Sequence, residues 1–129
     1  MILTGKVKSG KGDCAHWLEV LNDWYYAKTG LRLYPGSLNL ALDRDYHLPK
    51  RSIRLEKEEY GGRVSVSMQP CTVFGRKAFI LRTDLNASGK GDHPLSLIEI
   101  ATDIGLRKAF GLSDGDSVDV CVEDEQESV

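Results

Sequence analysis

Apolar and polar residues alternate over several short stretches of this chain of 129 residues. Such alternation is the pattern of β-strands that bury one face and expose the other. With the turn-forming residues between the stretches, it predicts strands over 2–7, 37–42, 64–68, 95–100 and 117–122. Two further strands, over 71–74 and 77–81, flank Gly75 and Arg76 and predict a β-hairpin with a tight turn. We therefore expect a mainly β fold.

Helical periodicity occurs in two places. We expect the first helix to begin after Asp13, which can cap it, and to end at Gly30. Its apolar positions are Trp17, Leu18, Leu21, Trp24 and Tyr25. A second, short helix has Asp103 as its cap and ends at Gly111. Because helices are few and no regular βαβ alternation is present, the pattern predicts a small β-barrel with helices laid against it.

The composition is that of an ordinary globular protein, with 41% hydrophobic and 28% charged residues. We expect one domain over 1–122, followed by an acidic, frayed tail over 123–129. The formal net charge of −2 gives no electrostatic support for nucleic-acid binding. Cys14, Cys71 and Cys121 lie far apart without a Cys-x-x-Cys pair, which indicates reduced thiols and not a zinc site or a disulfide framework.

No apolar run in the chain approaches the ~20 residues of a membrane span. The first residues also lack the basic region and the long apolar core of a secretion signal. We therefore expect a cytoplasmic protein that does not bind membranes.

The segment from Pro35 to Leu40 carries the strongest chemical signal. Ser37 and Asn39 stand two residues apart at the start of a predicted strand, so their side chains share one face. A hydroxyl and an amide oxygen side by side suit a hard cation such as Mg²⁺, which takes few protein ligands and keeps water and phosphate oxygens for the rest. The alternative is that Pro-Gly-Ser is only a turn before an amphipathic strand.

A glycine-containing loop, Ser9-Gly10-Lys11-Gly12-Asp13, precedes the first predicted helix. Its backbone N–H groups, the positive end of the helix and the lysine could together hold phosphates. The sequence is neither a Walker A motif nor a complete G-x-G-x-x-G, so an ordinary loop is the alternative. Beside a Mg²⁺ pair, however, a phosphate-binding loop would supply what phosphoryl transfer needs.

Three further residues are candidates for a site. Glu99 lies between Ile98 and Ile100 in an apolar strand, so it either faces solvent or lines the rim of a pocket. Arg107 could bind a base or a phosphate through its forked donors, although most surface arginines are only solvated. His93 follows a glycine-rich loop over 86–92 and is a candidate acid or base for which the sequence identifies no partner.

The aromatic residues Trp17, Trp24, Tyr25 and Tyr26 could form a stacking platform for a flavin or a base. Aromatic residues at helical spacing more often belong to the core, and we favour that interpretation. The sequence offers no Ser-His-Asp or Cys-His arrangement and therefore no clear general base.

Three blocks of the chain, in this order, resemble the CTP-dependent riboflavin kinase family. They are Ser9-Gly10-Lys11-Gly12, Tyr34-Pro35-Gly36-Ser37-Leu38-Asn39-Leu40, and Ile98-Glu99-Ile100 followed by the segment from Leu106 to Val118. The resemblance covers nearly the whole chain, and Pro-Gly-Ser-Leu-Asn is its most specific part. It implies a six-stranded cradle-loop β-barrel that transfers the γ-phosphate of CTP to the 5′-hydroxyl of riboflavin, giving FMN and CDP.

The resemblance also implies roles for individual residues. Ser37 and Asn39 would bind Mg²⁺, and Glu99 would contact the flavin. The residues that would hold the nucleotide are Gly10, Lys11, Gly12, Asp13, Cys14, Ala15, His16, Ile104, Gly105, Leu106 and Arg107. We expect a monomer whose partners are CTP or CDP and riboflavin or FMN.

The chain departs from the family pattern in three places. Ser37 replaces the more usual threonine but keeps the hydroxyl. The glycine loop leads directly into a helix, and glycine or aspartate stands within 89–93 where the family has a threonine for the flavin. These changes leave open a noncatalytic flavin- or nucleotide-binding module on the same barrel. A DNA-binding barrel, suggested only by the segment over 112–118, is opposed by the acidic charge balance.

Overall fold

The structure is a computed structural model that describes residues 1–10 and 13–123. Its strands are β1 (Ile2–Lys8), β2 (Leu38–Leu42), β3 (Ile53–Leu55), β4 (Val66–Val73), β5 (Arg76–Thr83), β6 (Leu97–Ala101) and β7 (Ser117–Val122). Its helices are α1 (Asp13–Val20), α2 (Asn22–Thr29), α3 (Lys57–Tyr60), α4 (Asp84–Ala87) and α5 (Leu106–Ala109). Lys11 and Gly12 of the predicted phosphate loop lie outside the described residues, as do residues 124–129 of the predicted tail.

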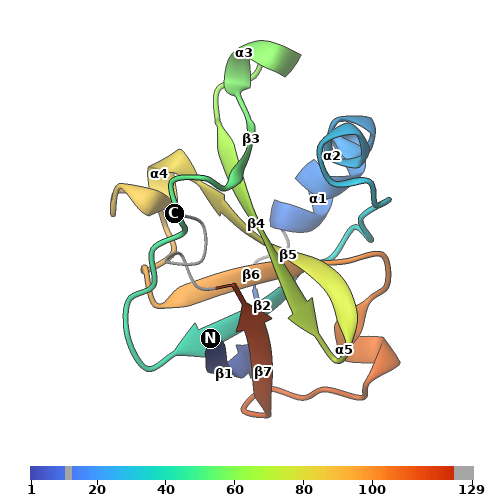
Figure 1. The fold of residues 1–129 in the computed structure, drawn as a ribbon, viewed down its shortest axis with the longest axis vertical. Coiled ribbons are helices and arrows are strands. Elements are labelled where there is room, and N and C mark those ends of the chain that lie inside the picture. Colours follow the sequence, from blue (N-terminus) through green and yellow to red (C-terminus); the bar gives the residue numbers. More distant parts are fainter. Residues whose placement is uncertain (11–12, 124–129) are drawn as a thin grey trace.

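Within the described residues, six antiparallel strands close into a barrel in the order β4-β5-β6-β2-β1-β7, and β7 pairs with β4 to complete the circle. The prediction of a mainly β fold with a six-stranded barrel is confirmed. β3 pairs with the first part of β4, and Figure 1 shows it leading with α3 away from the barrel. Pro70 of β4 lies between the residues that pair with β3 and those that pair with β7, where a missing N–H is tolerated.

Apolar side chains form two clusters, one inside the barrel and one outside it. The inner cluster takes residues from each of the six barrel strands. The outer cluster lies between strands β3 to β6 and the helices α1 and α2, which contribute Leu18, Leu21 and Tyr25. Figure 1 shows both helices on this side of the barrel. The helices are therefore held by a hydrophobic layer of their own.

Strand β5 is buried on both faces because its side chains alternate between the two clusters. Ala78 and Ile80 belong to the inner cluster, and Phe79 and Leu81 belong to the outer one. This burial explains why the sequence of the strand is a continuous apolar run, whereas a strand with one face in solvent would alternate apolar and polar residues. The β4–β5 hairpin is confirmed, but it turns at Phe74 and Gly75, both with positive φ, one residue earlier than predicted.

The first predicted helix is in fact two helices that break at Leu21. Asn22 and Asp23 follow the break, and residues of this kind favour the start of a helix over its interior. Gly30 ends α2 in the left-handed conformation, at φ 77°, as predicted.

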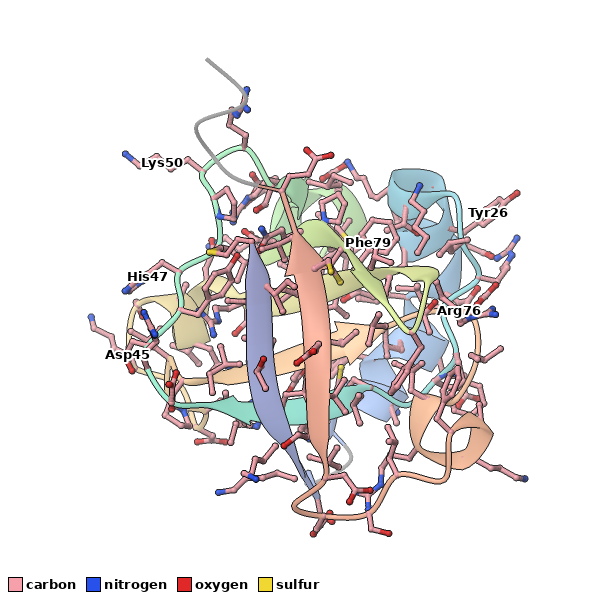
Figure 2. The ribbon with its side chains drawn as sticks, turned by 60° about the horizontal axis from the view of Figure 1, so that its bottom comes forward. Tyr26, Asp45, His47, Lys50, Arg76 and Phe79 are labelled. Carbon is pink, nitrogen blue, oxygen red and sulfur yellow. The ribbon has the colours of Figure 1, made fainter. Side chains whose placement is uncertain are left out.

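The favoured interpretation of the helical aromatic residues as core is correct only for Tyr25. Tyr25 is 4% exposed, whereas Trp17, Trp24 and Tyr26 are 51%, 40% and 45% exposed. Figure 2 shows Tyr26 pointing outward. Since the helices cover one face of the sheet, only one side of each helix can be buried.

Other differences from the prediction concern short elements. Asp103 does not cap α5, because its Oδ1 accepts a hydrogen bond from Arg76 Nη2 at 2.6 Å, and Gly105 precedes the helix without a side-chain cap. The predicted loop over 86–92 begins inside α4, which Thr83 caps. β3 and part of α3 occupy the segment over 50–59, whose sequence shows little periodicity.

Arg54 of β3 joins this added strand to α4. Its two terminal nitrogens donate to the two carboxylate oxygens of Asp84 at 2.6 and 2.9 Å, and Nη2 also donates to Glu56 at 2.8 Å. The guanidinium holds the pKa of Asp84 below its ordinary 3.8 and that of Glu56 below its ordinary 4.5. Both carboxylates are therefore charged at neutral pH.

We expect the free energy of unfolding to stay level from about pH 8 to about pH 5 and to fall below about pH 4. A carboxyl group whose pKa is lower in the folded state stabilises the fold above its unfolded pKa, and this stabilisation is lost as pH falls through the folded pKa. Asp84→Asn should make unfolding less sensitive to acid, as measured by urea denaturation at a series of pH values. The control is Asp45→Asn, at an exposed carboxylate (Figure 2), and equal acid sensitivity in both variants would contradict the expectation.

Candidate functional site

The centre of the candidate site is a pair of residues on neighbouring strands. Asn39 of β2 and Glu99 of β6 are directly opposite each other in the antiparallel ladder. Their strand neighbours Leu38 and Ile98 are buried inside the barrel, so alternation directs Asn39 and Glu99 to its outer face. This is the face that α1 and α2 partly cover. The predicted split of β6 between an apolar face and a face that carries Glu99 is confirmed.

Asn39 has a buried oxygen that lacks a partner. The residue is 9% exposed, and its Oδ1 accepts no hydrogen bond from any residue that the structure describes. An amide oxygen in this condition is costly unless something else binds it. Ser37 is half-buried and stands two residues earlier, immediately before β2. The donor set, a neutral amide oxygen near a hydroxyl, fits a hard cation such as Mg²⁺.

The glycine loop passes directly against Asn39. A Cβ atom built on Gly10 would lie 2.0 Å from Asn39 Nδ2, so any other residue here would have to displace the Asn39 amide or the loop. The loop leads into α1, whose helix starts at Asp13. The structure therefore places the glycine loop beside Asn39.

Cys14, in the first turn of α1, interacts with both Ser37 and Glu99. Burial raises the pKa of the Cys14 thiol to about 12, and the charge of Glu99 adds to this rise, while the hydrogen bond with Ser37 opposes it. A thiol with this pKa stays neutral at physiological pH and is a poor nucleophile. Ala15 and His16 follow in the helix, where His16 is exposed and its ring meets Trp17 edge to face.

The segment 104–107 directs its two apolar side chains toward the inner cluster of the barrel. Leu106 is buried in the inner cluster, and Ile104 packs against the same cluster. Gly105 lies against the ring of Tyr34, because a Cβ atom there would be 2.9 Å from Tyr34 Cε1. Of the four residues predicted here, only Arg107 directs a charged group outward.

Arg107 is connected to the glycine loop through Asp114. Ser9 Oγ donates to the two oxygens of Asp114 at 3.0 and 2.9 Å, and Arg107 Nη1 donates to Asp114 Oδ1 at 2.8 Å. The hydrogen bond from Ser9 contributes most, and the one from Arg107 next, to holding the pKa of the Asp114 carboxyl below its ordinary range. Backbone bonds between Val7 and the 115–116 segment fix the turn that carries Asp114. Asp114 thus places the loop and the arginine side by side.

Asp114→Asn should loosen this connection and raise the KM for the nucleotide that the family resemblance implies by a few-fold at most, because solvent screens an exposed ion pair. We expect kcat to be unchanged, since Asp114 touches neither reacting group. Steady-state kinetics with varied nucleotide would measure this. Asp119→Asn removes a similar exposed bond, from Thr4 at 2.7 Å, and is the control; the same rise in KM there would argue against the connection.

His93 has the partner that the sequence could not identify. Its Nδ1 lies 3.0 Å from Glu99 Oε1, and the two side chains are only 25% and 17% exposed. Glu99 thus contacts His93 from the loop before β6 and Cys14 from α1. The pairing depends on the path of a loop between α4 and β6, which no local pattern predicts.

The described part of the chain lacks two other features. Residues 1–10 and 13–123 contain no group of three or more His, Cys, Asp or Glu side chains arranged to hold a metal ion. In the same ranges, no helix has the length and apolar character needed to cross a membrane.

Comparison with known proteins gives consistent matches. A family model named for CTP-dependent riboflavin kinases and described as a domain of unknown function, DUF120, matches residues 7–122. A riboflavin kinase of Staphylothermus marinus is 25% identical over 127 residues, which are 97% of this chain and 94% of that protein. Riboflavin kinases of Methanocella arvoryzae and Ignicoccus hospitalis are 30% and 32% identical; the match covers 95% and 93% of this chain but 57% and 70% of theirs.

Proposed function

Because this chain belongs to the CTP-dependent riboflavin kinase family, we propose that it transfers the γ-phosphate of CTP to the 5′-hydroxyl of riboflavin, giving FMN and CDP. The relatives named above are riboflavin kinases, which supports the acceptor; the choice of CTP rests on the family's name. One observation carries the proposal at the level of the site. The buried oxygen of Asn39 has no partner among the described residues, and the amide of the same side chain lies in close approach to Gly10 of the glycine loop.

In this proposal Ser37 and Asn39 hold Mg²⁺ through the hydroxyl and the amide oxygen. When bound, the cation would neutralise charge on the triphosphate during transfer. Asn39 suits this role because its oxygen lacks a partner among the described residues. The role of Ser37 is supported by its place two residues before Asn39 and by its interaction with Cys14.

The nucleotide is proposed to lie between the glycine loop and the segment 104–107. Backbone N–H groups at the start of α1 favour phosphate oxygens, and the forked donors of Arg107 favour them as well. Asp114 holds Arg107 through Nη1, so the guanidinium is oriented beside the loop. The backbone of 104–106 is proposed to contact the pyrimidine, since the side chains of Ile104 and Leu106 pack into the barrel.

Glu99 is proposed to contact riboflavin from β6. It lies opposite Asn39 in the ladder, so a flavin held by Glu99 would lie beside the proposed cation ligand. Catalysis of this kind depends mainly on placing the acceptor oxygen in line with the phosphorus and on neutralising charge.

The test is FMN formation by the purified protein from riboflavin and Mg²⁺ with CTP, ATP, GTP or UTP in separate reactions. Chromatography should detect FMN and CDP in the CTP reaction, and EDTA should stop it. If FMN formed only with another nucleotide, that nucleotide would replace CTP as the proposed phosphate donor. No FMN with any of the four would reject the kinase, and calorimetric binding of CDP or FMN without product would then support the noncatalytic module.

A further inference from the structure

His93 and Glu99 form a half-buried dyad next to the proposed cation ligand. His93 Nδ1 lies 3.0 Å from Glu99 Oε1. Glu99 is the ladder partner of Asn39, so the dyad stands on the same outer face of β2 and β6 as the amide oxygen. A carboxylate that accepts the Nδ1 proton leaves the other ring nitrogen, Nε2, with a free lone pair.

The chain that follows His93 is held firmly. The buried guanidinium of Arg82 donates to the carbonyl oxygens of Leu95 and Leu97, both at 3.0 Å, and to that of Tyr46. Leu97 N also donates to Pro94 O at 3.0 Å. His93 is therefore fixed from two directions, by these bonds along the chain and by Glu99 at its ring.

We propose that His93 is the general base of the reaction, an inference that rests on the proposed kinase function. As riboflavin attacks, its 5′-hydroxyl gives its proton to His93 Nε2 and its oxygen forms the bond to the γ-phosphorus. The bond between that phosphorus and the bridging oxygen breaks, and its electron pair leaves with the nucleoside diphosphate. The charge that the imidazole gains faces the carboxylate of Glu99, which stabilises it.

The test compares His93→Gln with the wild type in the full chain. Loss of a general base should lower kcat by about 100-fold or more, because such groups contribute about 10²-fold to 10⁴-fold. We expect the KM values of riboflavin and nucleotide to stay within about threefold, and riboflavin binding, followed by quenching of its fluorescence, to be retained. His47→Gln is the matched control, since His47 is exposed on the connection between β2 and β3 (Figure 2) and should behave as wild type.

A second variant separates chemistry from structure. Imidazole added to His93→Ala should restore part of kcat, whereas it should not affect the wild type; a variant that is merely misfolded would not respond. Wild-type kcat in His93→Gln, or a rise in the riboflavin KM with kcat unchanged, would overturn the role of His93 and leave the kinase standing. A wild-type protein without kinase activity would instead overturn both proposals.

Discussion

Replacing Asn39 with alanine is expected to abolish most phosphoryl transfer without unfolding the protein. Charge stabilisation by a bound cation contributes several kcal/mol, so we expect kcat/KM to fall by about 10³-fold. The fold should tolerate the change, because a buried amide oxygen without a partner costs about 1–3 kcal/mol and alanine removes it. Asn39→Ala should therefore have a Tm equal to or above that of the wild type.

Two further variants make this expectation specific. Asn39→Asp keeps an oxygen ligand and should retain cation binding, followed with Mn²⁺ by electron paramagnetic resonance, whereas Asn39→Ala should lose it. Asn22→Ala is the matched control, because Asn22 donates to Leu33 O and accepts from Arg32. It should lower the Tm and leave kcat/KM unchanged. If Asn39→Ala retained Mn²⁺ binding and activity, Asn39 would not be a ligand of the metal.

Gly10→Ala is expected to produce the second largest loss of activity. The new Cβ would collide with Asn39 Nδ2, 2.0 Å away, so the loop or the amide must move by an ångström or more. A displacement of about this size in a catalytic group can cost about 100-fold in rate. We expect such a loss in kcat/KM for the nucleotide, with little change in the Tm because Gly10 is exposed.

Gly61→Ala is the opposite case and serves as the control. Gly61 has a φ of 70° and open space around it, so alanine there is strained without any collision. The left-handed conformation costs roughly 1 kcal/mol for alanine, so the Tm should fall while kcat/KM stays unchanged. If Gly10→Ala and Gly61→Ala lost equal activity and equal stability, the close approach of the loop to Asn39 would have no role in catalysis.

Most strands and the hairpin could be predicted because each has a clear local pattern, but the strands predicted over 64–68 and 71–74 are one continuous strand, β4. Ser117 to Val122 alternates regularly, and its strand bounds agree with the structure. β3 could not be predicted because only three residues pair, and α3 could not because none of its four residues is buried. The exposure of Trp17 and Trp24 was also beyond local reasoning, since it depends on which side of the helices meets the sheet.

The candidate site was predictable as a set of residue types but not as an arrangement. The sequence predicts that Ser37 and Asn39 share one face of a strand, whereas β2 begins at Leu38 and Ser37 immediately precedes it, so their pairing stays a prediction. The position of Glu99 opposite Asn39 requires the register of β2 on β6, and its contact with His93 requires the path of a loop. Arg107 and Asp114 are seven residues apart in a segment whose turn brings them together, and no periodicity records that contact.

The two apolar clusters on either side of β5 have a consequence for how the protein opens. Because the two clusters are distinct, we expect the layer of α1 and α2 to exchange its amide hydrogens in a subglobal opening that leaves the barrel closed. The glycine loop is the covalent joint between these two cooperative units, since it runs from β1 to α1. A ligand held by this loop and by Asn39 would couple the helical layer to the barrel. Its binding free energy would include the free energy needed to hold the two units in their packed arrangement.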